Sequence, residues 1–311
     1  MFPADAGAAQ KPVSGGELYQ ETQLLMGTFV TISLICASRQ QADTALALAW
    51  EGIRDRIAIF DRHNADSALG LLNSQGTLAA APAELIAVLD QAKLVGQLTN
   101  DAFNPAIAPV VDLYRPCKDG APLPGKQAVA EALALAAPGG VRQSGTKLRL
   151  TRTGMRLTLD GIAKGHIADK VSEILLQNGV ANHLVNAGGD IRVSGLAEKG
   201  RPWTIGVENS LLTGGLEEIK IRSGGIATSG GSQNFYDRNR KHHHLISHRT
   251  GKSPDIISVT VKAPTTAEAD ALATALSLLP PSQAVRLVQA RLHTECLIIS
   301  PQGRHSSKGW A

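Results

Sequence analysis

The segment at residues 157–169, LTLDGIAKGHIAD, constrains the fold more than any other part of the chain. Its first residues are apolar and resemble a short strand, and Gly161 permits a tight turn into a helix that begins near residue 162. Lys164 and Gly165 then fall at the helix start, where unpaired N–H groups and the positive end of the helix dipole favour an anion. The pattern predicts a strand, a turn and a helix that can hold a phosphate, although an ordinary tight turn has the same pattern.

The composition limits the class of protein. The chain has 311 residues, 43% of them hydrophobic, which is enough for one large or two ordinary domains with a core. No run approaches the roughly 18 apolar residues of a membrane span. The net charge is only +4 and 4% of residues are aromatic, so the stacking platforms of single-strand nucleic-acid binders are scarce. We therefore expect an anionic small ligand, no nucleic-acid partner and no membrane-spanning segment.

The cysteines and the first residues say little about chemistry. Cys36, Cys117 and Cys296 lack the CxxC spacing of structural zinc sites and do not suggest a disulfide framework. Residues 1–16 are small and aperiodic, so we expect a disordered tail followed by one folded domain over residues 17–311. The tail lacks the basic and apolar regions of a signal peptide.

Hydrophobic periodicity predicts helices and strands in a mixed order. The expected helices cover residues 41–60, 83–98, 128–136, 162–178, 267–279 and 282–291. The expected strands cover residues 24–36, 183–186, 190–194, 203–207, 218–221, 225–228, 243–247, 256–261 and 294–300, with a hairpin over 149–159 that turns near Thr153 and Gly154. Helices in blocks and strands that look antiparallel favour an α+β fold over a doubly wound sheet.

A carboxylate and a hydroxyl lie four residues apart in the predicted helix at 267–279. Asp270 and Thr274 share one helix face and can converge on one hard cation. Oxygen ligands of this kind suit Mg²⁺, which takes waters or phosphate oxygens at its remaining positions. The alternative is that Asp270 stabilises the helix dipole and Thr274 is a packed hydroxyl.

Four of the nine histidines fall within residues 241–251, KHHHLISHRTG. His242 and His244 would share one face of a strand and could bind zinc, although no cysteine or acidic third ligand is nearby. A single functional histidine before a turn at 249–251 is a second interpretation, and a basic exposed strand end is a third.

Glycine-rich strand ends at residues 185–192 and 225–232 would let a backbone approach a ligand closely. Together with the segments above, they resemble the ApbE family, the FAD:protein FMN transferases, in the family's order from about Leu24 to Ser300. The landmarks are Met26-Gly-Thr28, Asp66-Ser67 with Asn73, Asp101-Ala-Phe-Asn-Pro105, Gly161-Ile-Ala-Lys-Gly165, Asn186-Ala-Gly-Gly-Asp190, Ala227-Thr-Ser229, residues 244–251 and residues 269–274.

The resemblance implies a fold and an activity. The fold would be a T-fold-like α+β architecture, with mixed or antiparallel sheets, flanking helices and a ligand cleft between two lobes. The activity would be Mg²⁺-dependent transfer of FMN from FAD onto a threonine or serine hydroxyl of an acceptor flavoprotein, with release of AMP. The alternatives are a metal-dependent FAD pyrophosphatase that gives FMN and AMP, and an FAD-binding accessory protein without transfer activity.

The resemblance also assigns roles to single positions. Asp270 and Thr274 match the family's metal-binding side chains, and the backbone carbonyl of Gly161 matches a third metal ligand. The FAD contacts would include Met26, His63, Ala102, Phe103, Asn104, Thr158, Asp160 and Lys164. A neutral hydroxyl needs a base, and we expect His244 to be that catalytic base. An unperturbed histidine has a pKa of about 6.5, so the rate would rise with pH through neutrality.

The chain departs from the family pattern at several positions. Thr158 stands where the family has an Asp, and Asp160 replaces the first glycine of a Gly-Gly pair. The run at 244–251 lacks the family's Asp and Pro, because Ser247 and His248 stand there. We expect these changes to affect transfer more than binding. Family acceptors often lie outside the cytoplasm, so we expect a periplasmic or inner-membrane-associated protein whose leader is absent from this sequence.

Overall fold

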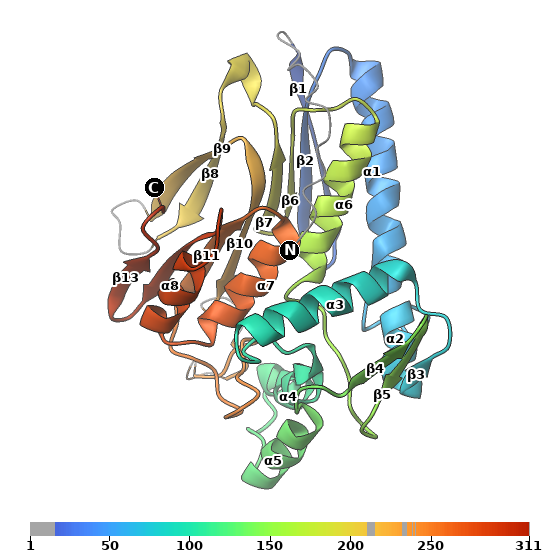
Figure 1. Cartoon of the computed structure of the whole chain (residues 1–311), viewed down its shortest axis with the longest axis vertical. Coiled ribbons are helices and arrows are strands. Elements are labelled where there is room, and N and C mark those ends of the chain that lie inside the picture. Colours follow the sequence, from blue (N-terminus) through green and yellow to red (C-terminus); the bar gives the residue numbers. More distant parts are fainter. Residues whose placement is uncertain (1–15, 210–214, 232–234, 238, 240, 311) are drawn as a thin grey trace.

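The computed structural model describes residues 16–209, 215–231, 235–237, 239 and 241–310. The tail expected at 1–16 lies outside the described residues, apart from Gly16. Antiparallel sheets and helices are mixed along the described chain, which confirms the predicted α+β class (Figure 1).

The largest sheet has eight strands, and each strand is antiparallel to its neighbours. Its order is β1-β2-β6-β7-β10-β11-β12-β13. The strands are β1 (Glu17–Leu25), β2 (Thr28–Cys36), β6 (His183–Ala187), β7 (Asp190–Ser194), β10 (Ser223–Gly230), β11 (Ser258–Ala263), β12 (Glu295–Ser300) and β13 (Gly303–Ser306).

Helices cover one face of this sheet (Figure 1). They are α1 (Arg39–Phe60), α6 (Ala163–Gln177), α7 (Thr266–Ser277) and α8 (Pro281–Gln289), and α3 (Ala83–Leu98) packs against α7. Ile32 of β2, Ile53 of α1, Leu175 of α6 and Leu272 of α7 are fully buried in the core between the sheet and these helices. Burial of this kind stabilises a structure by about 25 cal/mol per Å² of apolar surface.

A hairpin covers the opposite face of the sheet. It consists of β8 (Trp203–Glu208) and β9 (Leu216–Ile221). Trp203, Ile205 and Ile219 from the hairpin share a second core cluster with Ile191 and Val193 of β7. Because β8 alternates between buried and exposed residues, its inner side chains all face the sheet.

A smaller region lies at the end of the helical layer (Figure 1). It contains α2 (Ala68–Gln75), α4 (Ala108–Tyr114), α5 (Lys126–Leu135) and a three-stranded sheet of order β3-β5-β4. The strands are β3 (Thr77–Leu78), β4 (Val141–Ser144) and β5 (Lys147–Leu150). Tyr236 and Ile246 pack in a third cluster with residues of α4 and α5, and the Tyr114 hydroxyl donates a hydrogen bond to the Gly251 carbonyl at 3.1 Å. The histidine-rich segment is thereby attached to this smaller region.

Three of the predicted elements are wrong. The hairpin predicted over 149–159 is instead β4 paired with β5, and the described chain at 155–159 forms no strand. The strand predicted at 243–247 is replaced by a loop in which His243 makes one isolated bridge to Phe235. The strand predicted at 24–36 is two strands, because Met26 (φ 54°) and Gly27 (φ 71°) turn the chain back on itself.

Most other elements are confirmed. The helix predicted at 83–98 has these bounds in α3, and the helix predicted at 162–178 differs from α6 by one residue at each end. Among the described residues, none of the helices combines the length and apolar character needed to cross a membrane.

Candidate active site

The chain enters α6 through a buried extended arm rather than the predicted strand. Asn73 binds both main-chain groups of Leu157: its Nδ2 donates to the Leu157 carbonyl at 2.9 Å, and its Oδ1 accepts from the Leu157 N–H at 2.7 Å. The Thr158 N–H donates to the Pro105 carbonyl at 2.8 Å. These long-range bonds replace the ladder of a sheet and satisfy the buried backbone. They also fix Thr158 beside the loop at 102–105.

The first turns of α6 and α7 meet backbone to backbone. A Cβ on Gly165 of α6 would lie 2.4 Å from the Thr266 carbonyl oxygen, and a Cβ on Gly225 of β10 would lie 2.4 Å from the Thr266 Cα. Only glycine fits at such distances. Asp169 of α6 accepts hydrogen bonds from the N–H groups of Thr266 and Ala267 at 2.8 and 2.9 Å, so one helix caps the other.

A buried ion pair lies at the start of α6. The Lys164 ammonium donates to Asp190, which follows the Gly188-Gly189 turn and is 2% exposed. Burial alone would lower the pKa of Lys164, but attraction to Asp190 and then to Asp270 outweighs burial and raises that pKa. Burial raises the pKa of Asp190, and Lys164 opposes that effect. The lysine therefore stays charged, held at the helix end where an anion is favoured.

Asp270 lies against the same helix end. Its Oδ2 accepts a hydrogen bond from the Gly165 N–H at 3.2 Å, and its side chain is buried. Burial and then repulsion from Asp190 raise the pKa of Asp270 well above the usual range. A cation bound beside Asp270 would relieve both effects, so the protonation of this carboxyl and the binding of a cation are coupled.

The oxygen atoms around Thr274 fit a hard cation. A Cβ on Gly161 would lie 2.7 Å from Thr274 Oγ1, so the Gly161 backbone approaches this hydroxyl closely. Thr274 Oγ1 also lies 3.2 Å from Ser229 Oγ. Thr274 follows Asp270 by one turn of α7, as predicted from the sequence. A carboxylate, a hydroxyl and a backbone oxygen are the donor types that Mg²⁺ prefers.

The described residues also bear on the zinc interpretation. Within the described ranges, no group of three His, Cys, Asp or Glu side chains gathers at a possible metal site. The zinc interpretation therefore finds no support in the described residues. His242 is stacked on Tyr114, with ring centroids 5.2 Å apart, and its Nδ1 lies 3.4 Å from Asp237 Oδ2.

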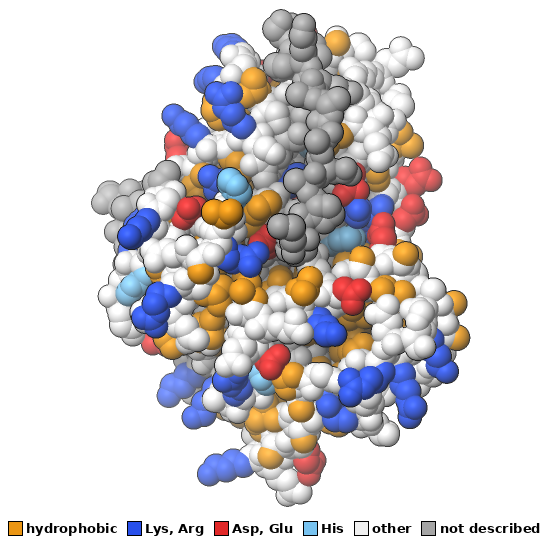
Figure 2. All heavy atoms as spheres, in the orientation of Figure 1, with side chains coloured by type: hydrophobic (Ala, Val, Ile, Leu, Met, Phe, Trp, Pro, Cys, Tyr) orange, Lys and Arg blue, Asp and Glu red, His pale blue; other side chains and the backbone are white. Residues whose placement is uncertain are grey.

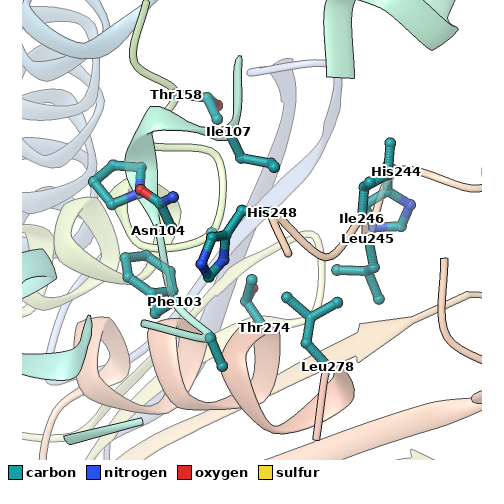
Figure 3. Close-up of a pocket in the computed structure, with 13 residues that line it drawn as sticks. Phe103, Asn104, Ile107, Thr158, His244, Leu245, Ile246, His248, Thr274 and Leu278 are labelled. Carbon is teal, nitrogen blue, oxygen red and sulfur yellow. The ribbon is translucent and has the colours of Figure 1, made fainter. Parts of the chain in front are cut away.

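A small pocket opens beside these groups. Figure 3 shows Thr274 of α7 and Leu278, which directly follows α7, at this pocket, with Phe103 and Asn104 on one side and His244 on the other. Of the residues predicted from the sequence, seven line the pocket: Ala102, Phe103, Asn104, Thr158, Gly161, His244 and Thr274. Asn104 is held in place because its Nδ2 donates to the Ala136 carbonyl at 2.6 Å.

The two histidines of the pocket are neutral at pH 7. Burial, followed by the charges of His243 and Lys164, lowers the pKa of His244 to about 4. This corrects the expectation of an unperturbed pKa. His244 Nδ1 is buried and has no hydrogen-bond partner among the described residues. Burial and then Arg249 lower the pKa of His248, which also lines the pocket.

Asp160 marks the other end of the site. Its Oδ2 lies 3.4 Å from Arg62 Nε, and Arg62 also binds Asp112 at 2.9 Å. The Asp160 side chain is 68% exposed, so it faces solvent beside Arg62. His63 follows Arg62, and its ring contacts the Arg115 guanidinium at 3.0 and 3.4 Å. Burial and then the neighbouring arginines lower the pKa of His63.

Five of the predicted site residues are not in the pocket lining: Met26, His63, Asp160, Lys164 and Asp270. His63 lies in the loop between α1 and α2, beside Arg115. Met26 lies at the turn between β1 and β2, and Thr28 of the same turn contacts Gly188, where a Cβ would lie 2.4 Å from Thr28 Oγ1. The Met26 turn therefore lies beside the Gly188-Gly189 turn, and Met26 is not in the pocket lining.

Comparisons with known proteins agree with this arrangement. A model of the ApbE family matches residues 26–298. The chain belongs to the ApbE family. An FAD:protein FMN transferase from Treponema pallidum is 30% identical over 311 residues, covering 92% of this chain and 85% of that protein. The FAD:protein FMN transferase of Escherichia coli strain K12 is 28% identical, covering 74% of this chain and 70% of that protein.

Solved ApbE structures share the fold. The flavin transferase ApbE from Vibrio cholerae has a TM-score of 0.82 at 25% identity, covering 95% of this chain and 98% of that chain. An ApbE protein from Thermotoga maritima has a TM-score of 0.85 at 24% identity, covering 94% of this chain and 97% of that chain. The described chain therefore contains nearly the whole of these ApbE folds.

The sequence alone missed two groups of this ApbE site. In the sequence, Asp190 is an acidic residue directly after a Gly-Gly turn. Its partner Lys164 is 26 residues earlier in the chain, so the buried pair appears only in the folded structure. Arg62 was hidden in a polar loop, although its side chain is only 4% exposed. A buried arginine next to two acids is a signal that only the tertiary structure provides.

Proposed function

We propose that this ApbE-family chain is an FAD:protein FMN transferase that uses Mg²⁺ and a threonine or serine hydroxyl of an acceptor flavoprotein. The acceptor oxygen forms a bond to the FMN phosphorus, and the bond from that phosphorus to the bridging oxygen breaks. AMP leaves with the bridging oxygen, and the hydroxyl proton passes to a base of the protein. The names of the relatives support this class of enzyme.

The observation that carries the proposal is the junction of α6 and α7. Lys164 and the α6 N-terminus supply positive charge, and Asp270 approaches the same point from α7. A diphosphate placed there would meet the Lys164 ammonium group and the positive end of the α6 dipole. Phe103 and Asn104 on the opposite wall could then orient the rest of the substrate.

Asp270, Thr274 and the Gly161 carbonyl would hold Mg²⁺ at this junction. When bound, the ion would neutralise negative charge on the phosphate oxygens as it develops. Lys164 would remain paired with Asp190 and would add positive charge at the start of α6. Positioning by fixed charges is the main contribution of a protein to phosphoryl transfer.

His244 would act as the base. A neutral imidazole is required, and the lowered pKa keeps the ring neutral from pH 5 upward. A residue with this pKa is a weak base, so its contribution would come from position more than from basicity. His244 lines the pocket opposite Phe103 and Asn104, and its Nδ1 has no hydrogen-bond partner among the described residues.

The test is incubation with FAD and Mg²⁺, with and without a peptide that contains one threonine. A transferase gives AMP and a flavin-labelled peptide, which mass spectrometry detects. AMP with free FMN would indicate the pyrophosphatase, and the absence of AMP would indicate an accessory protein that only binds FAD. For an acceptor outside the cytoplasm, the protein would lie in the periplasm or at the inner membrane, which fractionation of the full-length product tests.

A further inference from the structure

A second groove adjoins the pocket of the candidate active site. It lies between α3 and β4, with apolar side chains such as Leu89, Leu148 and Leu157 in its wall. Phe103, Asn104 and Pro105 line both the pocket and the groove. A segment that lies in the groove would therefore end at the wall of the pocket.

One wall of the groove is an outer strand. β4 is at the end of the order β3-β5-β4, and its residues Val141 and Gln143 line the groove. Val141 pairs with Leu150, whose N–H is instead donated to the Gly76 carbonyl on the β3 side at 2.8 Å. In an antiparallel pair the hydrogen-bonded positions alternate, so the main-chain groups of Val141 and Gln143 point away from β5. They are available to a further strand.

The same small sheet has an unusual charge pattern. Residues 138–157 contain five basic residues and no acidic residue, namely Arg142, Lys147, Arg149, Arg152 and Arg156. Arg142 and Arg149 are exposed and lie directly opposite each other on β4 and β5. Like charges in this position destabilise a sheet. Neither arginine has an acidic partner in the described part of the chain, whereas Asp90 and Asp101 line the groove on the side of α3. Figure 2 shows Lys and Arg side chains gathered over this end of the molecule.

We propose that the acceptor protein binds here: its modified segment adds to β4 as an extended strand, and its acidic side chains contact Arg142 and Arg149. This inference rests on the transferase function proposed above. Strand addition provides affinity through main-chain hydrogen bonds, and the flanking charges provide specificity. Phe103 and Asn104 line both the groove and the pocket that holds His244, so a segment bound in the groove lies next to that pocket.

The experiment compares two synthetic peptides of equal length, each with one central threonine. One peptide has aspartates on both sides of the threonine, and the other has lysines. The wild-type protein should modify the aspartate peptide with a kcat/KM that is roughly fivefold or more higher, since each exposed ion pair contributes about 0.2–1 kcal/mol. The double variant Arg142→Glu/Arg149→Glu should invert this preference, and 0.5 M salt should weaken both preferences.

Two further variants separate the strand from the charges. Gln143→Pro removes a groove-facing N–H without removing a bond to β5, so it should raise KM for both peptides and leave FAD affinity unchanged. Arg201→Glu has the same charge change on an exposed residue outside the small sheet, and it should leave the preference unchanged. The proposal would be overturned if the double variant kept the wild-type preference between the two peptides. It would also be overturned if the double variant lost FAD affinity to the same extent as peptide activity, because the groove would then bind FAD.

Binding of the labelled aspartate peptide to the FAD-free protein separates this inference from the transferase function. If the wild type releases AMP but labels neither peptide, the transferase function fails, and weaker peptide binding by the double variant still supports the groove. Equal peptide binding by both proteins refutes the groove. Vesicles rich in anionic lipid test a membrane as the partner. If the wild type binds these vesicles and the double variant does not, while both proteins bind the peptide equally, the basic face binds a membrane and the proposal is refuted.

Discussion

Replacement of His244 by alanine gives the sharpest test of the proposed chemistry. Loss of a positioned general base typically lowers a rate by about 10²–10⁴. FAD affinity should change little, because the ring lines the pocket opposite Phe103 and Asn104 while the expected diphosphate site lies at Lys164. His242→Ala is the matched control, since that ring is stacked on Tyr114 and is not part of the pocket lining.

The pH dependence of the wild-type transfer rate gives a second, independent test. With a pKa of about 4, His244 is neutral across the physiological range, and protonation reduces the rate only as the pH falls through about 4. At pH 5.5 such a group is about 97% neutral, whereas a histidine with an unperturbed pKa of 6.5 is about 9% neutral. The value of kcat/KM for transfer should therefore change by less than about twofold between pH 5.5 and 7.5 through this group.

The assay is single-turnover AMP release, measured with FAD affinity on the same preparation of each protein. Equal losses of rate and affinity in His244→Ala would refute the base assignment and make His244 a structural residue. A tenfold rise of the wild-type rate over the same pH range would contradict the lowered pKa. Retention of full transfer by His244→Ala would make His248 the next candidate.

Four other perturbations follow from the site. Asp270→Asn removes the charge but keeps the shape, so Mg²⁺ affinity measured by calorimetry should fall by more than tenfold, and an unchanged Mg²⁺ requirement would exclude Asp270 as a ligand. Gly161→Ala places a Cβ 2.7 Å from Thr274 Oγ1, so it should weaken Mg²⁺ binding while the melting temperature stays within a few degrees; the reverse result would make Gly161 a folding residue only. Asp190→Ala leaves the Lys164 ammonium without its partner, and urea unfolding should show a loss of about 2–4 kcal/mol together with weaker FAD binding. Burial lowers the pKa of His166 and His183 to about 4, so these histidines bind protons in the unfolded chain before they do so in the folded protein. The free energy of unfolding should therefore be constant above pH 6.5 and fall toward pH 4. In His183→Gln this pH dependence should be shallower.

Local sequence patterns were sufficient where local packing decides the structure. The apolar spacing in 83–98 predicted α3 with its observed bounds, because Leu85, Val88 and Ala92 all face one core. Patterns failed where distant groups decide. The turn expected at Thr153-Gly154 exists, with Gly154 at φ 83°, but the following arm is bound by the side chain of Asn73 and not by a strand.

The site shows the same division. Asp270 and Thr274 could be paired from their spacing alone, since four residues make one helical turn. The placement of Phe103, Asn104 and His244 around them came from the family resemblance, and no periodicity in the sequence connects these segments. The electrostatics were beyond sequence analysis, because the lowered pKa of His244 results from burial that only the folded chain creates.

The close contact of Gly165 and Gly225 with Thr266 has a consequence for the precision of the site. Because backbone touches backbone on both sides of the α7 start, the position of Asp270 relative to Lys164 is set by main-chain packing rather than by deformable side chains. Any side chain at either glycine would push the start of α7 away from α6 or from β10, so neither position allows a small adjustment of the junction.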